Sequence, residues 1–354
     1  MPNQTPSQGS SRIVVLGSLN ADLTIYTQRL PEPGETLHGE GFTVNPGGKS
    51  ANQAVAAGKL GANVSLIGAV GQDANGTMLL ESCAAANVDV SHVRRAENVE
   101  TGVAVVTVDA QGENSIVISA GANGTLAPSD VEAAHAVFDG AAVLCLCLEV
   151  AQATVEAAAM AGRDAGARVL LNLSPYAPIA ASLAGACDVL LVNAHEASQF
   201  LDGAPIPAPD ASLADWEPVL GHLVARGLPS AVVTLGAQGS VVLDSNASAG
   251  ERIVRINPTR VDAVDTTGAG DAFTGGLAAR LAAGDSLAEA AAFASVGAAL
   301  AATKKGTQAA YPDAEAVAHK RNGSANTRIA PGSRGVVQPT TRSFSVRSRK
   351  GSGV

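Results

Sequence analysis

The stretch Arg12-Ile13-Val14-Val15-Leu16-Gly17-Ser18-Leu19-Asn20-Ala21-Asp22 joins a run of apolar residues to a polar segment that begins with glycine. Residues 12–16 predict a buried strand, and the apolar run stops where strands commonly lead into functional loops. Short runs of the same kind recur at 64–67, 103–108, 143–148, 169–173, 189–192 and 231–235. Alanine-rich segments with helical character lie between several of them, at 51–60, 151–165 and 272–283. This alternation predicts an α/β fold with a mainly parallel sheet and helices on both faces.

Two segments interrupt the alternation of strands and helices. Residues 24–44 and 101–118 read as extended chain punctuated by Gly and Pro, which predicts a small β-sheet lid beside the main sheet. Residues 1–11 are polar and lack the apolar stretch of a signal peptide, so we expect a disordered start. The longest nearly apolar stretch, 290–302, is shorter than the roughly 20 residues that a membrane span needs. We therefore expect a cytoplasmic protein whose body is one large unit, residues 12–313.

Charge is distributed unevenly along the 354 residues. The net charge of −9 argues against a body that binds nucleic acid, because phosphate backbones favour a basic surface. Residues 1–314 carry 15 bases and 31 acids, a net charge of −16, whereas the last forty residues carry +7. We expect 314–354 to be a basic, disordered tail, for which a solvated segment is favoured over nucleic-acid contact. The four Cys residues are too few and too scattered for a disulfide framework, which fits a reducing compartment.

The segment Asp265-Thr266-Thr267-Gly268-Ala269-Gly270-Asp271-Ala272-Phe273 carries the strongest functional signal. Its small residues let the backbone approach a ligand closely. A helix that follows would leave N–H groups free at its start, and such groups bind phosphate or stabilise a transferring phosphoryl group. Asp271 would then be placed to take a proton from a hydroxyl nucleophile. Taken alone, an ordinary helix-capping turn explains this Asp equally well.

Two further segments suit a ligand with several hydroxyls. Asn20 and Asp22 alternate, so in extended backbone both side chains project to one side and can bind vicinal hydroxyls, although an Asx turn is the alternative. In the segment 45–52, NPGGKSAN, a Gly-Gly turn precedes a helix that carries Lys49 and Asn52 on one face. Lys49 could hold a substrate oxygen or phosphate, although a lysine at a helix start is usually solvated. Asn52 precedes a mostly apolar segment, 53–57, that we expect to be buried, and a buried amide needs hydrogen-bond partners.

Polar residues also end two of the predicted strands. Glu149 follows the apolar run 141–148 and lies where the ligand sites of parallel sheets gather, although a solvated strand-end acid is the favoured reading of this residue alone. Asn193 and Glu196 end the run 189–192 and can reach Mg²⁺-bound waters and a nucleotide phosphate. His195 between them fits a spacer. The cysteines 145 and 147 predict core packing rather than a metal site.

Two standard nucleotide-binding fingerprints are incomplete. Gly48-Lys49-Ser50 ends like a P-loop, but Thr43 stands where that motif needs glycine. Gly268-Ala269-Gly270 begins like a dinucleotide fingerprint, but Phe273 stands where its third glycine belongs. Neither of those two folds is supported by its own motif.

Taken in order, these segments resemble the ribokinase-like sugar kinases over about residues 12–312. The resemblance rests on GSLNADL (17–23), PGGKSANQAVAAG (46–58), TGVAVV (101–106), GENSIVISAGAN (112–123), NAHE (193–196), TLGAQG (234–239) and the family signature DTTGAGDAF (265–273). It implies a three-layer α/β/α fold with a mainly parallel central sheet and a small β-sheet lid. In this family the lid also forms the contact of a homodimer.

The resemblance implies a role for each site residue. The sugar-binding set is Asn20, Asp22, Gly48, Lys49, Asn52, Glu149 and Asp271. Asp271 also matches the catalytic base, and the backbone of Gly268, Ala269 and Gly270 matches the anion hole. The positions that contact ATP and Mg²⁺ are Asn193, Glu196, Thr234, Gly236, Gly239, Gly270 and, against the adenine, Ser295. The site of an activating monovalent cation, commonly K⁺, would use Asp265, Thr267, Ala301, Lys304, Gly306 and Ala310.

Two positions and one segment depart from the family pattern. Ser50 stands where glycine is frequent, and Ala310 replaces a residue that often donates a side-chain oxygen to the cation. The basic tail has no counterpart in that pattern.

The resemblance implies an ATP-dependent kinase that phosphorylates the 5-hydroxyl of D-ribose, giving D-ribose 5-phosphate and ADP. Such an enzyme needs no membrane and no nucleic acid as a partner. Two alternatives remain open on the sequence. One is the same fold acting on another sugar or a nucleoside, and the other is a non-catalytic ribose sensor whose basic tail contacts nucleic acid.

Overall fold

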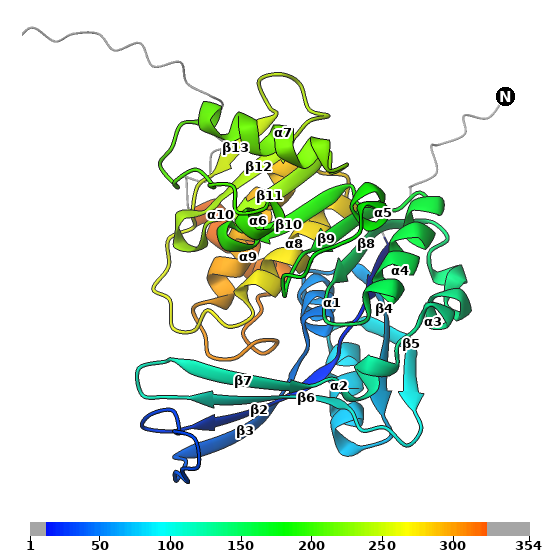
Figure 1. Ribbon diagram of the computed structural model, residues 1–354, viewed down its shortest axis with the longest axis vertical. Coiled ribbons are helices and arrows are strands. Elements are labelled where there is room, and N and C mark those ends of the chain that lie inside the picture. The colour runs from blue at the N-terminus through cyan, green and yellow to red at the C-terminus, as the bar shows by residue number, and fades with distance from the viewer. Residues whose placement is uncertain (1–11, 324–354) are drawn as a thin grey trace, which may run out of the picture.

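The computed structural model describes residues 12–323, which form a layered α/β body and a smaller sheet that projects from it (Figure 1). The predicted fold class is confirmed. The two predicted terminal segments, 1–11 and the part of the tail beyond 323, lie outside the described residues.

The central sheet has nine strands in the order β13-β12-β11-β10-β9-β8-β1-β4-β5. The seven strands from β11 to β5 run parallel, and β12 and β13 add an antiparallel edge. Every apolar run predicted as a strand forms one, but 103–108 lies in the smaller sheet instead of this one, and β5, β12 and β13 were not predicted. The strands are β1 Arg12–Leu16, β4 Asn63–Gly71, β5 Val88–Ala96, β8 Ala141–Cys147, β9 Arg168–Asn172, β10 Val189–Asn193, β11 Ser230–Thr234, β12 Ser240–Asp244 and β13 Ile253–Ile256.

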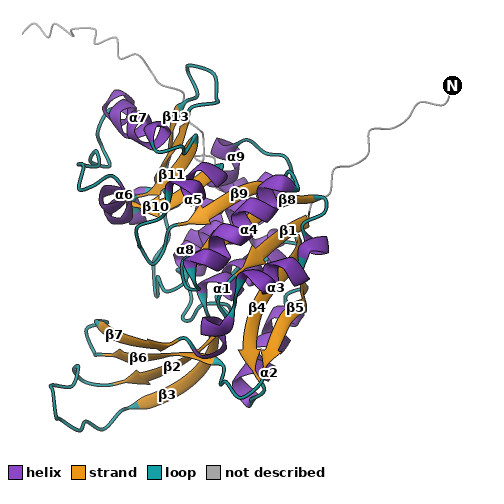
Figure 2. Ribbon diagram, turned by 45° about the vertical axis from the view of Figure 1, so that its right-hand side comes forward, coloured by secondary structure: helices purple, strands orange, loops and turns teal. Residues whose placement is uncertain are grey.

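Helices cover both faces of the central sheet (Figure 2). On β1, Val14 and Leu16 belong to one buried cluster, while Ile13 and Val15 belong to the other. Alternate residues of a strand point to opposite faces, so a strand that is apolar throughout must be covered on both. The first cluster includes residues of α3 Pro128–Ala133, α4 Gln152–Asp164, α5 Ala181–Ala186, α6 Ala194–Phe200 and α7 Glu217–Ala225. The second includes residues of α1 Lys49–Lys59, α2 Ala74–Ala85, α8 Ala269–Ala282 and α9 Leu287–Ala301.

The second sheet has four strands in the order β3-β2-β6-β7 and includes both predicted lid segments. The outer pairs, β2 with β3 and β6 with β7, are antiparallel, whereas β2 and β6 are parallel. Its first strand begins earlier than predicted, because β2 starts at Asn20 instead of residue 24. The strand therefore includes the candidate ligand residues Asn20 and Asp22. The strands are β2 Asn20–Tyr26, β3 Gly41–Gly47, β6 Gly102–Val108 and β7 Asn114–Ser119.

The segment predicted as a disordered tail does not begin at residue 314. Helix α10, Ala314–Gly323, occupies its first ten residues, so that part of the prediction is wrong. Val317 on this helix is fully buried, and an apolar side chain packed against the body stabilises the first part of the segment. Among residues 12–323, no helix is long and apolar enough to cross a membrane.

Candidate active site

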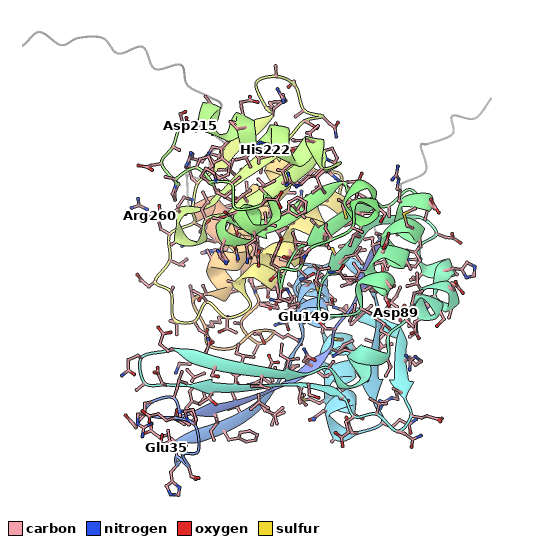
Figure 3. The ribbon with its side chains drawn as sticks, in the orientation of Figure 1. Glu35, Asp89, Glu149, Asp215, His222 and Arg260 are labelled. Atoms are coloured by element: carbon pink, nitrogen blue, oxygen red, sulfur yellow. The ribbon has the colours of Figure 1, made fainter. Side chains whose placement is uncertain are left out.

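The candidate site lies where the strand order of the central sheet reverses. From β1 the chain builds outward through β4 and β5, and from β8 it builds the other way through β9, β10 and β11. A crevice forms beyond the carboxyl ends of the strands at such a point. Glu149, just after β8, lies in Figure 3 close to where the small sheet meets the body.

Glu149 joins the ends of β8 and β1 to the start of α1. Its Oε2 accepts a hydrogen bond from Ser18 Oγ at 2.6 Å and another from the Lys49 backbone N–H at 3.0 Å. Gly48, which precedes α1, has φ +86°, and a Cβ there would lie 2.7 Å from the Asn20 backbone nitrogen. Only glycine permits this turn, which brings the start of α1 against β2. The solvated-acid reading of Glu149 is therefore wrong.

Asn20 and Asp22 lie on the same face of β2, as the alternation of residues predicts. Asn20 Oδ1 accepts from Asn123 Nδ2 at 2.8 Å, which leaves the Asn20 NH₂ group available to donate to a ligand. Burial, with the negative charges of Glu149 and Asp271, raises the pKa of Asp22 to about 7, although Lys49 opposes the shift. Three carboxylates thus converge on one lysine.

Asp271, in the first turn of α8, is the most buried of these carboxylates. Its Oδ2 accepts from Asn52 Nδ2 at 3.0 Å and its Oδ1 accepts from Gln53 Nε2 at 3.1 Å. Burial raises the pKa of Asp271, while Lys49 and the two amide donors lower it. The pKa of Lys49 is raised in spite of its burial, because Asp271 and Glu149 favour the charged amine. The arrangement suits a buried carboxylate that exchanges a proton with a ligand.

The glycines before Asp271 form the start of α8. Gly268 caps the helix with φ +74°, a left-handed conformation that glycine adopts without strain. N–H groups in the first turn of a helix have no acceptor within it, which makes the turn suitable for an anion. The Ala269 N–H differs, because it donates to the Thr266 carbonyl at 3.1 Å. In this conformation Ala269 is thus already engaged, unlike a free anion-hole donor.

A cavity opens beside Asp271, towards the ends of β9, β10 and β11. It brings together several of the residues that we predicted to bind ATP and the transferred group. Its lining is Lys49, Asn172, Ser174, Leu191, Val192, Asn193, Glu196, Thr234, Gly268, Gly270 and Asp271. Asn172, Ser174, Leu191 and Val192 were not predicted. Gly236 begins the short 3-10 helix η4, Gly236–Gln238, between β11 and β12, and Gly239 follows it. Ser295 is buried on α9, and none of these three residues lines the cavity.

Asn193 and Glu196 form a capping box at the start of α6. Asn193 Oδ1 accepts from the Glu196 N–H at 2.8 Å, and Glu196 Oε2 accepts from the Asn193 N–H at 2.8 Å. The box fixes both side chains at the cavity wall, so their structural role does not exclude a ligand role. His195 between them is exposed, which fits a spacer.

The residues predicted to hold a monovalent cation come from the segment before α8 and from the end of α9 with the loop after it, and Asp265 links the two segments. Asp265 Oδ1 accepts from the Thr267 N–H and Oδ2 accepts from the Gly306 N–H, both at 2.9 Å. The Ala301 carbonyl accepts from the Lys304 N–H at 3.3 Å. Ala310 is buried and offers no side-chain oxygen. Within residues 12–323, no three His, Cys, Asp or Glu side chains gather as a metal site.

Three site residues escaped the sequence analysis: Gln53, Asn123 and Gln308. Each is a nearly fully buried amide, and each bonds to a predicted residue, namely Asp271, Asn20 and Asn52 respectively. A polar side chain inside an apolar run is a signal that could have found Gln53. The other two lie far along the chain from their partners, and local pattern does not reveal such pairs.

This fold and site define a phosphotransferase of the α/β class. The site has a buried carboxylate at a helix start, a cluster of polar groups suited to a sugar, and an adjoining cavity. The chain belongs to the pfkB family of carbohydrate kinases, whose model matches residues 10–314. The ribokinase of Schizosaccharomyces pombe is 37% identical over 307 residues, 85% of this chain and 94% of that protein.

Two more relatives bear on the substrate. The deoxyribokinase of Salmonella typhimurium is 35% identical over 304 residues, 86% of this chain and 96% of that protein. The structure of Arabidopsis thaliana ribokinase complexed with ribose and ATP is 31% identical, has a TM-score of 0.80, and covers 87% of this chain and 97% of that one.

Proposed function

We propose that this protein transfers the γ-phosphoryl group of ATP to the 5-hydroxyl of D-ribose, giving D-ribose 5-phosphate and ADP. The observation that carries the proposal is the position of Asp271. Its carboxylate lies at the start of α8, at the wall of the cavity, and is held by two amide donors from α1. The family and the ribokinases among its relatives, one of them solved with ribose and ATP, support this activity.

In the proposed reaction Asp271 takes the proton of the 5-hydroxyl as that oxygen attacks the γ-phosphorus in line. Asn20, Asp22, Asn52 and Glu149 hold the other hydroxyls of the sugar, with Gly48 shaping the turn beside them. Lys49 and the backbone of the segment 268–270 neutralise charge that develops on the transferring group. The Ala269 N–H is released from Thr266 when it serves this purpose. The small sheet covers the sugar and excludes water.

Nucleotide and ions complete the proposed site. Asn193, Glu196 and Thr234 at the cavity wall would face the phosphates, while Gly236, Gly239 and Ser295 would contact the nucleoside. Glu196 uses one oxygen in its capping box, and its other oxygen would hold Mg²⁺-bound water, so the donor set fits Mg²⁺. Bound Mg²⁺ supplies charge neutralisation at the phosphates.

For K⁺ the fit rests on the loops that Asp265 ties together, with backbone oxygens at 267, 301, 304 and 306 as ligands. Ala310 removes one side-chain oxygen from this set, so we expect water or a carbonyl in its place. A bound K⁺ would supply fixed positive charge beside the start of α8.

A homodimer formed through the small sheet is part of the proposal. Val44, Leu23, Val105 and Val117 are paired neighbours across all four strands and therefore form one apolar row. Val44, Val105 and Val117 are 40%, 45% and 69% exposed, and Phe42 in the next row is 60% exposed. The row lies on the face opposite Asp22, and an exposed apolar patch of this kind is typical of a protein interface. We place the dimer in the cytoplasm, where ATP is available.

A panel of sugars tests the substrate. We expect ATP consumption with D-ribose to exceed that with fructose or adenosine, and K⁺ to increase the rate. The deoxyribokinase at 35% identity makes 2-deoxyribose the second candidate. A higher kcat/KM for 2-deoxyribose would reassign the substrate, and ribose binding without ATP consumption would favour the sensor.

A further inference from the structure

A chain of hydrogen bonds reaches Asp271 from outside the proposed sugar site. Ser82 Oγ on α2 donates to Gln308 Oε1 at 2.7 Å, and Gln308 Nε2 donates to Asn52 Oδ1 at 3.0 Å. Asn52 Nδ2 then donates to Asp271 Oδ2 at 3.0 Å. The chain thus connects a residue of helix α2 to the proposed base through two amides.

The direction of this chain is fixed at its Asp271 end. An ionised carboxylate only accepts hydrogen bonds, so Asn52 must turn its NH₂ group towards Asp271. Its oxygen then faces Gln308, which must turn its own NH₂ group towards Asn52. The Gln308 oxygen therefore faces Ser82, whose hydroxyl can donate. Each member has one productive orientation, and the orientation of Asn52 depends on Gln308.

Burial makes this dependence strict. Asn52 and Gln308 are 5% and 3% exposed, so water does not replace a missing partner. Gln308 is itself held in place, because Lys59 Nζ donates to its backbone carbonyl at 2.6 Å and to that of Tyr311 at 3.3 Å. Gln53 is the second donor to Asp271, but its own oxygen has no partner among the described residues. Asn52 is thus the donor whose orientation another side chain sets.

We propose that Gln308 is a positioning residue for phosphoryl transfer, which keeps the NH₂ group of Asn52 on the Asp271 carboxylate. The inference rests on the proposed function, in which Asp271 is the base. Gln308 touches neither Asp271 nor, in this scheme, the substrate. It also lies between Gly306 and Ala310, in the loop of the proposed cation site, so that loop and the base are mechanically connected.

Other charged and titratable groups act on Asp271 and must be kept constant in a test. They are Lys49 at the start of α1, Glu149 after β8, Asp22 on β2, Tyr311 before α10 and Cys147 on β8. A neutral substitution at position 308 leaves all of them unchanged. Glutamate at that position would add a charge and is therefore unsuitable.

Gln308→Met keeps the length of the side chain and removes the donor. Asn52 can then rotate, and the ionised form of Asp271 loses a hydrogen bond. We expect kcat to fall about tenfold and the acidic limb of the kcat–pH profile to move up by about one pH unit, with KM for ATP unchanged. Ser82→Ala is the matched control, because it leaves the Gln308–Asn52 bond in place, and we expect less than a threefold change in kcat.

Gln308→Met made in an Asn52→Ala background separates a positioning effect from a general disturbance of the fold. We expect Gln308→Met to add no further shift of the acidic limb there, because the residue through which it acts is gone. An unchanged pH profile in the single variant, or an equal shift in the Asn52→Ala background, would overturn the proposal. If Gln308→Met fails to fold, Gln308→Asn, which keeps the amide but is too short to reach Asn52, makes the same test.

Failure of the proposed function is recognised separately. Asp271→Asn measured beside these variants should be nearly inactive. If it retains normal turnover, Asp271 is not the base, whatever the Gln308 variants do.

Discussion

The two sheets of this protein differ in what covers them. The central sheet has helices on both faces, and its strand β1 is buried from Ile13 to Leu16. The small sheet carries large apolar side chains in water, among them Phe42 and Val117. The central sheet is therefore a scaffold whose core is fully covered by helices of its own chain. The small sheet has an apolar face that a partner protein would cover.

The proposed site lies at the border between these two sheets. Asp271 and Glu149 belong to the central body, whereas Asn20 and Asp22 belong to the root of the small sheet. The rigid body can fix the angle of a proton transfer, and the less covered sheet can move over a substrate. Asp271 and the two sugar-holding residues of the small sheet, Asn20 and Asp22, therefore have different mechanical support.

The largest expected effect comes from the body. Asp271→Asn keeps the shape of the side chain and removes its basicity, so kcat should fall on the order of 10²-fold or more. Ribose affinity, measured by calorimetry, should change little, and circular dichroism should show a normal fold. Turnover near that of the unchanged protein would refute the role of this residue.

The next effect comes from the root of the small sheet. Asp22→Asn replaces one carboxyl oxygen of the sugar set with an NH₂ group and should raise KM for ribose about tenfold, because an acceptor for a sugar hydroxyl is lost. Steady-state kinetics at several ribose concentrations measure this. An unchanged KM would separate the small sheet from sugar binding.

The same variant makes a separate prediction about stability. A carboxyl group with its pKa raised to about 7 disfavours folding increasingly as pH rises from about 4 to 7, because its charge is unfavourable in the folded state. Asp22→Asn should therefore stabilise the protein more at pH 8 than at pH 5, by about 2 kcal/mol. Urea unfolding at both pH values measures the free energy of unfolding. An equal gain in stability at pH 5 and pH 8 would show that the charge of Asp22 is not the cause.

An interface variant tests the uncovered face. Val117→Lys places a charge in the apolar row of the small sheet and should convert the proposed dimer to a monomer, as measured by light scattering after size-exclusion chromatography. The control is Val224→Lys, since Val224 on α7 is also exposed, at 46%, but lies on the body. If the dimer persists in Val117→Lys, or is lost equally in Val117→Lys and Val224→Lys, the small sheet does not form the interface.

The smallest effect is expected on thermal stability, from the buried Tyr311 beside the start of α8. The buried Tyr311 hydroxyl has no hydrogen-bond partner among the described residues, and a Cβ at position 268 would lie 2.7 Å from it. Tyr311→Phe removes an unsatisfied polar group, so Tm should stay the same or rise by about 1–3 °C. A clear fall in Tm, measured by calorimetry, would mean that this hydroxyl has a partner.

Much of the fold could be predicted from the sequence because its signals are local. Apolar runs such as 12–16 and 189–192 match strands almost residue for residue, and the helix after Gly268 is where the small residues indicate it. The strands β5, β12 and β13, which lie at or next to the edges of the central sheet, and the helix α10 were missed. Their patterns are short or strongly charged, and burial against distant segments, as at Val317, decides them.

The fold class, the family and the polar segments that carry the chemistry could all be predicted from the amino-acid order, because the periods of strands and helices and the order of motifs are local properties of the chain. The tertiary structure alone decided how those segments meet. It pairs Gln308 with Asn52 across 256 positions and Asn123 with Asn20 across 103, and it gathers three carboxylates around Lys49. Burial and charge act through space rather than along the chain, so no local pattern could have shown that the pKa of Asp22 is raised or that a glutamine positions an asparagine.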